Sequence, residues 1–224
     1  MDVTAIADYL AFSPVLAPLS SKERLDLAVR MHARHFGRNE VVFHRGDTAG
    51  QVYLIATGTV KISVEEEGGQ EVGIELIRGG DVFGELGLFD EGERSATATA
   101  LTETTAFTLA NKDFGDVLQQ NPAAMRELLS LLARRIRRST GHIEDLVFLD
   151  LPSRVAKCLI DQNELGGLTG RVELTQEEIA SFVGATRVAT NRVLVDLERR
   201  GAVKLGRGHV EIVDADILRK EIRH

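Results

Sequence analysis

The feature that most limits the fold of this chain is a cluster of glycines in its first half. Of the 21 glycines in the 224 residues, 12 lie between positions 37 and 92. Apolar residues alternate with other residues at 60–64, 72–76 and 96–100, and the sequence 65–69 is expected to form a hairpin tip. Such alternation, with turn residues about every ten positions, predicts short strands that form an all-β sandwich or barrel.

The apolar spacing becomes helical between Asn121 and Leu149. Steps of four and three residues define a seam, which consists of Met125, Leu129, Leu132, Ile136, Ser139, Ile143 and Leu146. A helix of about 28 residues is about 42 Å long, which is more than a small domain covers. We therefore expect the seam to pair with a second copy of the chain as a homodimer. The alternative is that the stripe packs on the barrel of its own chain.

The pair Leu151-Pro152 follows this helix. Because proline disfavours helical geometry in the residue before it, we interpret the pair as the end of the helix and as a domain boundary. The sequence thus predicts an α+β protein in three parts: a barrel domain with flanking helices at 1–120, a dimerisation helix with its hinge at 121–150, and a third domain at 151–224.

The third part carries the signals of a helix-turn-helix. Residues 175–178 form a capping box, in which Thr175 and Glu178 each satisfy a backbone amide of the other, and Gly184 marks a turn. Thr186 is expected to cap a second helix that runs to Arg200. Residues 202–213 contain a Gly-Arg-Gly turn between two apolar runs, which indicates a β-hairpin wing. These elements together predict a winged helix-turn-helix.

The charge of the chain is unevenly distributed around a net value of −7. Residues 1–150 carry an excess of eight negative charges, whereas residues 184–209 carry an excess of four positive charges. A local basic patch on an acidic chain is typical of a surface that reads double-stranded DNA, although a solvated helix face has the same composition. We expect DNA to meet Thr175, Thr186, Arg187, Val188 and Arg192.

The segment 83–98 carries the most specific chemistry. It reads Phe-Gly-Glu-Leu-Gly-Leu-Phe-Asp-Glu-Gly-Glu-Arg-Ser-Ala-Thr-Ala. A turn flanked by glycines exposes backbone amides to an anion, and Arg94 offers a planar cation that suits two phosphate oxygens. Glu85 would repel a phosphate but accept from a ribose hydroxyl. On chemistry alone, Glu85 and Arg94 fit a structural ion pair equally well.

This segment resembles the phosphate-binding cassette of cyclic-nucleotide-binding domains. Over nearly its full length the chain resembles the CRP/FNR family of bacterial transcription regulators, with a double-stranded β-helix barrel, a long dimer helix and a winged helix-turn-helix. The resemblance implies that Gly84 and Glu85, with Leu86 beside them, hold the ribose 2′-hydroxyl. It also implies that Arg94, Ser95 and Ala96 hold the cyclic phosphate, and that Ser139 and Thr140 touch the purine.

The effector that the resemblance implies is cyclic AMP, with cyclic GMP and cyclic di-GMP as alternatives. Binding would reorient the DNA-binding domains about a hinge at Asp150, Leu151 and Pro152, and RNA polymerase would be a further partner. The DNA-reading helix departs from the family at Val188, where a glutamate is common. Arg187 and Arg192 are retained, so the departure concerns the target sequence and not DNA binding itself.

Other functions find less support in the sequence. The single cysteine, Cys158, excludes an intramolecular disulfide and cysteine-clustered metal sites, and we expect an inert core thiol and no bound metal. His32, His35 and His44 could nominally ligate haem, but scattered surface histidines are commoner. A kinase or channel module and an enzyme are disfavoured because no catalytic motif or membrane span is visible. We therefore expect a cytoplasmic, non-enzymatic regulator.

Overall fold

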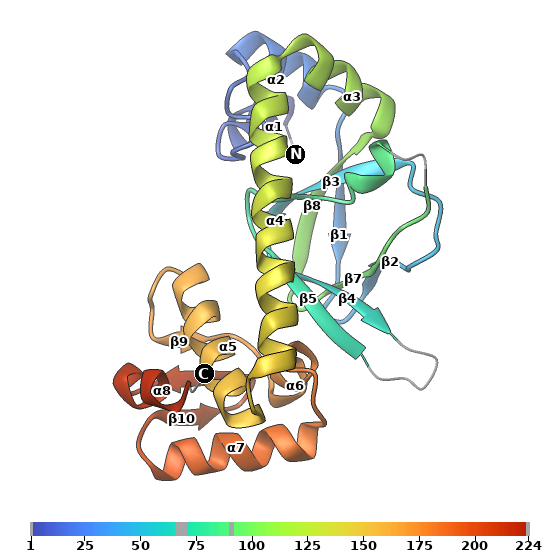
Figure 1. Ribbon diagram of the computed structural model, residues 1–224. Helices are drawn as coiled ribbons and strands as arrows, with labels where there is room; N and C mark the ends of the chain where they lie inside the picture. The colour runs from blue at the N-terminus through green and yellow to red at the C-terminus, as the bar shows by residue number, and fades with distance from the viewer. Residues whose placement is uncertain (1, 66–70, 90–91, 223–224) are drawn as a thin grey trace. The chain divides into compact units, whose positions relative to one another are not determined.

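The computed structural model describes residues 2–65, 71–89 and 92–222 of the chain (Figure 1). It divides into two compact units. The first unit contains residues 1–64 and 74–136, and the second contains residues 65–73 and 137–224. Residues 66–69 of the expected hairpin tip lie outside the described residues.

Two four-stranded sheets form the body of the first unit, in the orders β1-β8-β3-β6 and β2-β7-β4-β5. Their strands are β1 (His32–Phe36), β2 (Val41–Phe43), β3 (Gln51–Thr57), β4 (Val60–Glu65), β5 (Glu71–Ile77), β6 (Val82–Phe83), β7 (Thr97–Ala100) and β8 (Thr104–Ala110). Every strand pair with a defined register in these sheets is antiparallel. The glycine-rich alternation therefore predicted the strand-rich unit correctly.

Strand β3 separates the two apolar layers of this unit. Val52 and Leu54 belong to the layer shared with the helices, whereas Tyr53 and Ile55 belong to the layer inside the barrel. Because β3 is covered on both faces, five consecutive residues of it are buried. The helices around the first layer are α1 (Val3–Leu10), α2 (Ser21–Ala28), α3 (Asn111–Gln120) and the first half of α4 (Pro122–Phe148).

The apolar alternation predicted the strands better than it predicted their burial. Lys61 and Ser63 on β4 are buried, whereas Ile62 between them is only partly buried. Ile74 on β5 is 40% exposed. Alternation of side chains assigns residues to two faces of a strand, but it does not decide which face another part of the protein covers.

The second unit contains the winged helix-turn-helix that the sequence predicted. Its elements are α5 (Leu151–Leu165), β9 (Arg171–Val172), α6 (Gln176–Phe182), α7 (Arg187–Arg199), β10 (Val203–Gly206), β11 (His209–Ile212) and α8 (Ala215–Glu221). The wing hairpin β10–β11 extends to β9, which gives a three-stranded sheet. Thr175 forms the expected capping box with Glu178, and Thr186 caps α7 by accepting from the Ala189 amide.

The interpretation of Leu151-Pro152 as the end of the long helix was wrong. Helix α4 already ends at Phe148, and Leu151 and Pro152 form the first turn of α5. Asp150 caps this turn by accepting from the Ser153 amide. Proline is compatible with the first turn of a helix because its missing N–H has no partner to lose there.

One buried hydroxyl in α7 generates a stability prediction. Thr190 is fully buried, and its hydroxyl has no hydrogen-bond partner among the described residues. We expect Thr190→Val, which keeps the shape and removes the unpaired polar group, to raise the free energy of unfolding by about 1 kcal/mol. The same change at Thr186 removes a helix cap and should lower it by about 1 kcal/mol. Urea denaturation measures both free energies of unfolding. A Thr190→Val protein that is less stable than wild type would contradict the interpretation of the Thr190 hydroxyl as unpaired.

Candidate functional site: effector cassette and DNA-reading face

The cassette begins where β6 ends, at a glycine that the geometry requires. Gly84 has a φ of +76°, and a Cβ there would lie 2.6 Å from the guanidinium NH1 of Arg94. The space is used for a hydrogen bond, in which NH1 of Arg94 donates to the Gly84 carbonyl at 2.7 Å. Any side chain at position 84 would therefore push Arg94 out of its place.

Arg94 is held inside the barrel wall, with only 6% of the residue exposed. NH2 donates to the Gln51 carbonyl at 2.7 Å, and the guanidinium carbon lies 4.3 Å from the centre of the Phe43 ring. Burial lowers the pKa of Arg94, but a guanidinium remains charged in proteins. Its Nε is buried without a hydrogen-bond partner among the described residues. Of the five N–H donors of this fixed cation, two donate to the Gly84 and Gln51 carbonyls, which leaves donors for a ligand.

The predicted partners of Arg94 in the cassette lie close along the chain. Ser95 is exposed and Ala96 is buried directly before β7. Leu86 begins a short 3-10 helix, Leu86–Leu88, and is 47% exposed. All the cassette residues that the sequence singled out lie in the first unit, and a hydrogen bond joins Arg94 to Gly84.

Glu85 is a buried carboxylate that the sequence did not connect to its partner. Its side chain is 3% exposed, and Oε1 accepts from NH1 of Arg135 on α4 at 2.7 Å. NH2 of Arg135 donates to the Val82 carbonyl at 2.8 Å, and Nε lies 2.8 Å from Oε2 of Glu75 as an ion pair without hydrogen-bond geometry. Burial lowers the pKa of Arg135, but Glu85 and Glu75 outweigh it and raise the pKa above its ordinary value.

Sequence reasoning missed Arg135 and a second residue, Asn111. The side-chain amide of Asn111 donates to the Ala49 carbonyl at 2.8 Å and to the Gly87 carbonyl at 3.2 Å, which fixes the 3-10 helix of the cassette against the start of β3. Arg135 is one of four arginines between positions 134 and 138. No sequence signal distinguishes it from its neighbours.

The two hydroxyls expected at the purine lie on α4. Ser139 and Thr140 are exposed and belong to the second unit, whereas the cassette residues belong to the first. The helix also presents the predicted seam. Leu129, Ile136 and Ile143, each seven residues from the next, are 57%, 67% and 61% exposed. Their spacing keeps them on one stripe of α4.

Other seam residues contact their own chain. Met125 and Leu132 pack against the helical core of the first unit, together with the buried Leu128 and Leu131. Leu146 lies against Gly184 within the second unit. The alternative that the stripe packs on its own barrel therefore describes Met125 and Leu132, but not the exposed stripe.

The predicted DNA-reading residues gather at the amino ends of α6 and α7. Thr186, Arg187, Val188 and Arg192 are exposed, with Val188 at 74%, and Thr175 is half-buried. In the described residues, Arg187 and Arg192 form no ion pair, whereas Arg199 and Arg200 both pair with Asp196. The uncompensated positive charge of α7 thus lies in its first half.

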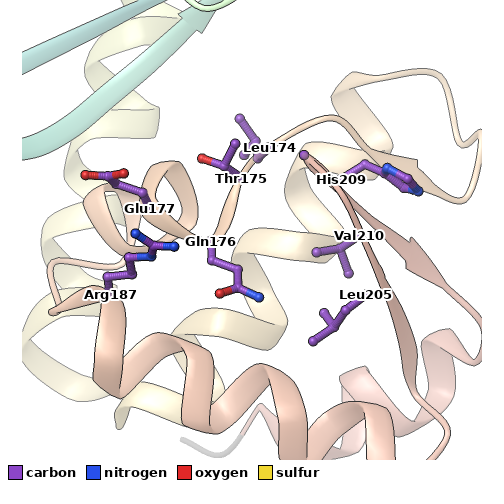
Figure 2. Close-up of a pocket in the computed structure, with 10 residues that line it drawn as sticks. Leu174, Thr175, Gln176, Glu177, Arg187, Leu205, His209 and Val210 are labelled. Carbon is purple, nitrogen blue, oxygen red and sulfur yellow. The ribbon is translucent and has the colours of Figure 1, made fainter.

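A pocket of about 270 Å³ opens beside these residues (Figure 2). Figure 2 shows Thr175, Gln176, Glu177 and Arg187 on the side of α6 and α7, and Leu205, His209 and Val210 on the wing. The His209 ring lies over Gly206, where a Cβ would be 2.2 Å from Cε1. His209 was not among the predicted residues, because its place at the pocket depends on the pairing of β10 with β11.

The fold and these two sites define a class of protein. A barrel with a phosphate-binding cassette, joined through a long helix to a winged helix-turn-helix, is the organisation of an effector-responsive DNA-binding regulator. The known proteins to which the chain is similar identify the family.

Two family models match the chain. Residues 33–121 match the cyclic nucleotide-binding domain, and residues 153–221 match the Crp-like helix-turn-helix domain. The CRP-like cAMP-activated global transcriptional regulator of Mycobacterium tuberculosis is 37% identical over 194 residues, which cover 84% of this chain and 87% of the relative. The cyclic AMP receptor protein of Thermus thermophilus is 34% identical over 207 residues, which cover 92% and 95%.

A solved structure agrees with these relatives. The catabolite activator protein of Thermus thermophilus is 32% identical, and the match covers 94% of this chain and 98% of the solved chain. The two structures superpose with a TM-score of 0.54. The chain belongs to the CRP/FNR family of transcription regulators. It combines a cyclic-nucleotide-binding domain with a DNA-binding domain, and family membership also supports dimerisation.

Three further findings concern the described chain outside these two sites. Desolvation raises the pKa of the Cys158 thiol to about 12, so this cysteine is nearly all thiol at neutral pH. Within residues 2–65, 71–89 and 92–222, no three His, Cys, Asp or Glu side chains are placed to hold a metal ion. No helix of the described chain has the length and apolar character to cross a membrane.

Proposed function

We propose that the effector is cyclic AMP and that its cyclic phosphate binds Arg94, Ser95 and the backbone near Ala96. The observation that carries the proposal is the buried Arg94, whose Nε has no partner among the described residues although the rest of its guanidinium is fixed. A preorganised planar cation beside an exposed serine hydroxyl suits the paired oxygens of a phosphate.

The ribose 2′-hydroxyl donates to Glu85 in this proposal, with Gly84 and Leu86 beside it. Oε1 of Glu85 is occupied by Arg135, and Oε2 has no hydrogen bond within the described residues. Ser139 and Thr140 contact the purine. Because hydroxyls both donate and accept, they also suit the guanine of cyclic GMP or cyclic di-GMP. The names of the Mycobacterium and Thermus relatives favour cyclic AMP.

We further propose that two copies pair along the exposed stripe of α4 and that Asp150, Leu151 and Pro152 act as the hinge. The dimer reads DNA of two-fold symmetry with Arg187, Val188 and Arg192, while Thr175 and Thr186 lie beside the phosphates. The regulator acts in the cytoplasm and contacts RNA polymerase. The support for this placement on DNA is that Arg187 and Arg192 form no ion pair within the described part of the chain, whereas Arg199 pairs with Asp196.

The phosphate assignment predicts a graded loss of binding. Arg94→Lys should weaken cyclic AMP by about tenfold, because an ammonium cannot reproduce the planar fork, and Arg94→Ala should weaken it further. Calorimetric titration measures both, with the exposed Arg38→Lys as a control that leaves affinity unchanged. If Arg94→Ala binds cyclic AMP as wild type does, the cassette assignment is wrong.

The dimer assignment predicts that Ile136→Asp drives the protein toward monomer. Two aspartates would face each other across the seam, so the substitution brings like charges together in an apolar contact. Sedimentation velocity measures the change. Arg134→Asp, which alters charge away from the stripe, should leave the dimer intact. A wild-type protein that sediments as a monomer with and without effector would exclude the assignment.

The DNA assignment predicts a change of sequence preference in Val188→Glu. Valine offers only a methyl surface, whereas glutamate accepts from a cytosine amino group, which gives about 1–3 kcal/mol of discrimination per base pair. If Arg192 instead pairs with the new carboxylate, specificity should relax. Randomised-site selection measures both results. Val195→Glu, two turns further along α7, should leave the preferred sequence unchanged. Identical preferences of wild type and Val188→Glu would show that residue 188 does not face the bases.

A further inference from the structure

A second carboxylate competes for the arginine that holds Glu85. Arg135 reaches Glu85 with NH1, the Val82 carbonyl with NH2 and Glu75 with Nε. The side chains of Arg135 and Glu75 are each 16% exposed, and that of Glu85 is 3% exposed. Glu75 comes from β5 and Glu85 from the cassette, so one α4 side chain joins two separate parts of the barrel wall.

The geometry determines how Glu85 can meet a ligand. A guanidinium is planar, and the plane of Arg135 is set by the hydrogen bonds from NH1 and NH2 together with the ion pair between Nε and Glu75, which lacks hydrogen-bond geometry. Arg135 is therefore oriented so that it engages Oε1 of Glu85 and not Oε2. Oε2 stays available to accept a hydrogen bond. Without the charge of Glu75 beside Nε, only the hydrogen bonds from NH1 and NH2 remain, and the guanidinium can shift toward both oxygens of Glu85.

A neighbouring carboxylate does not perform the same task. Asp81 also lies near Arg135, but its Oδ2 accepts from the Arg78 amide at 3.0 Å in the turn before β6. Glu75 is the carboxylate that contacts Nε of Arg135 directly.

We propose that Glu75 is a positioning residue that sets the preference of this regulator for ribose over deoxyribose nucleotides. It acts through Arg135, which it orients so that one oxygen of Glu85 faces the ribose 2′-hydroxyl. The inference rests on the proposed function, because it requires a cyclic nucleotide in the cassette. It adds a residue on β5 that does not touch the ligand.

The test compares the affinities of the full-length protein for cyclic AMP and for 2′-deoxy cyclic AMP, measured by calorimetry. Removal of the Glu75 charge alters the electrostatic potential at the phosphate, but this effect is the same for both nucleotides. The ratio of the two affinities therefore isolates the contact with Glu85. We expect wild type to prefer cyclic AMP by about tenfold or more, as for a hydrogen bond to a charged group.

Glu75→Gln should reduce this ratio about fivefold, and Glu75→Asp, which keeps the charge, should restore part of it. Arg135→Lys should also reduce the ratio, because an ammonium cannot hold two carboxylates in a fixed plane. Glu71→Gln makes the same change of charge on the same strand and should leave the ratio as in wild type. Thermal unfolding establishes whether each variant is folded. If Glu75→Gln does not fold, Glu75→Asp and Arg135→Lys still test the inference.

Two results would overturn the inference. An unchanged ratio in folded Glu75→Gln, whether absolute affinity rises or falls, would reduce Glu75 to a structural or purely electrostatic role. A wild-type ratio near one would show that Glu85 does not hold the 2′-hydroxyl, and the inference would fail with that contact. The Arg94 variants report separately on the phosphate, so failure of the effector assignment is distinguished from failure of the Glu75 assignment alone.

Discussion

The candidate effector site depends on two arginines: Arg94, which is buried in the barrel wall, and Arg135 of α4, whose side chain is 16% exposed. A buried guanidinium is tolerated only where acceptors surround it. The fold supplies these acceptors as carbonyls of Gln51, Val82 and Gly84 and as the carboxylate of Glu85. The turn at Gly84 and the path of α4 past β6 bring these acceptors to the two guanidinium groups.

Helix α4 carries both Arg135, which faces the cassette, and the exposed apolar stripe. Arg135 faces the cassette, and Ile136, the next residue, is 67% exposed. Successive residues of a helix point about 100° apart, so one turn of α4 can meet both the effector site and a second copy of the chain. The contact between Glu85 and Arg135 thus gives the cassette a direct mechanical connection to the helix that bears the seam.

In the DNA-binding unit, the distribution of charge depends on which charges are paired. Arg199 and Arg200 pair with Asp196, and Lys204 lies 4.0 Å from Glu211. These pairs neutralise the far end of α7 and part of the wing. Among the described residues of 184–209, the arginines that form no ion pair are therefore Arg187 and Arg192 in the first half of α7 and Arg207 in the turn of the wing, and Arg187 lines the same pocket as His209.

The sequence by itself determined the elements and the cassette. Period-two alternation, the capping box at Thr175, the cap at Thr186 and the glycine turns are local signals, because each depends on residues within a few positions of one another. The cassette motif likewise falls within residues 83–98, so its residues could be named in advance. The pair Leu151-Pro152 is also a local signal, but we misinterpreted it because a proline is found both just after the end of a helix and in the first turn of a helix.

The tertiary structure alone decided which charged residues serve the site. Glu85 and Arg135 are separated by 50 positions, and four arginines crowd residues 134–138, so only the path of α4 past β6 selects Arg135. The burial of Lys61 and Ser63, the bridge from Asn111 to Gly87 and the place of His209 at the pocket have the same origin. The physical reason is that burial and ion pairing are set by neighbours in space, which periodicity along the chain does not encode.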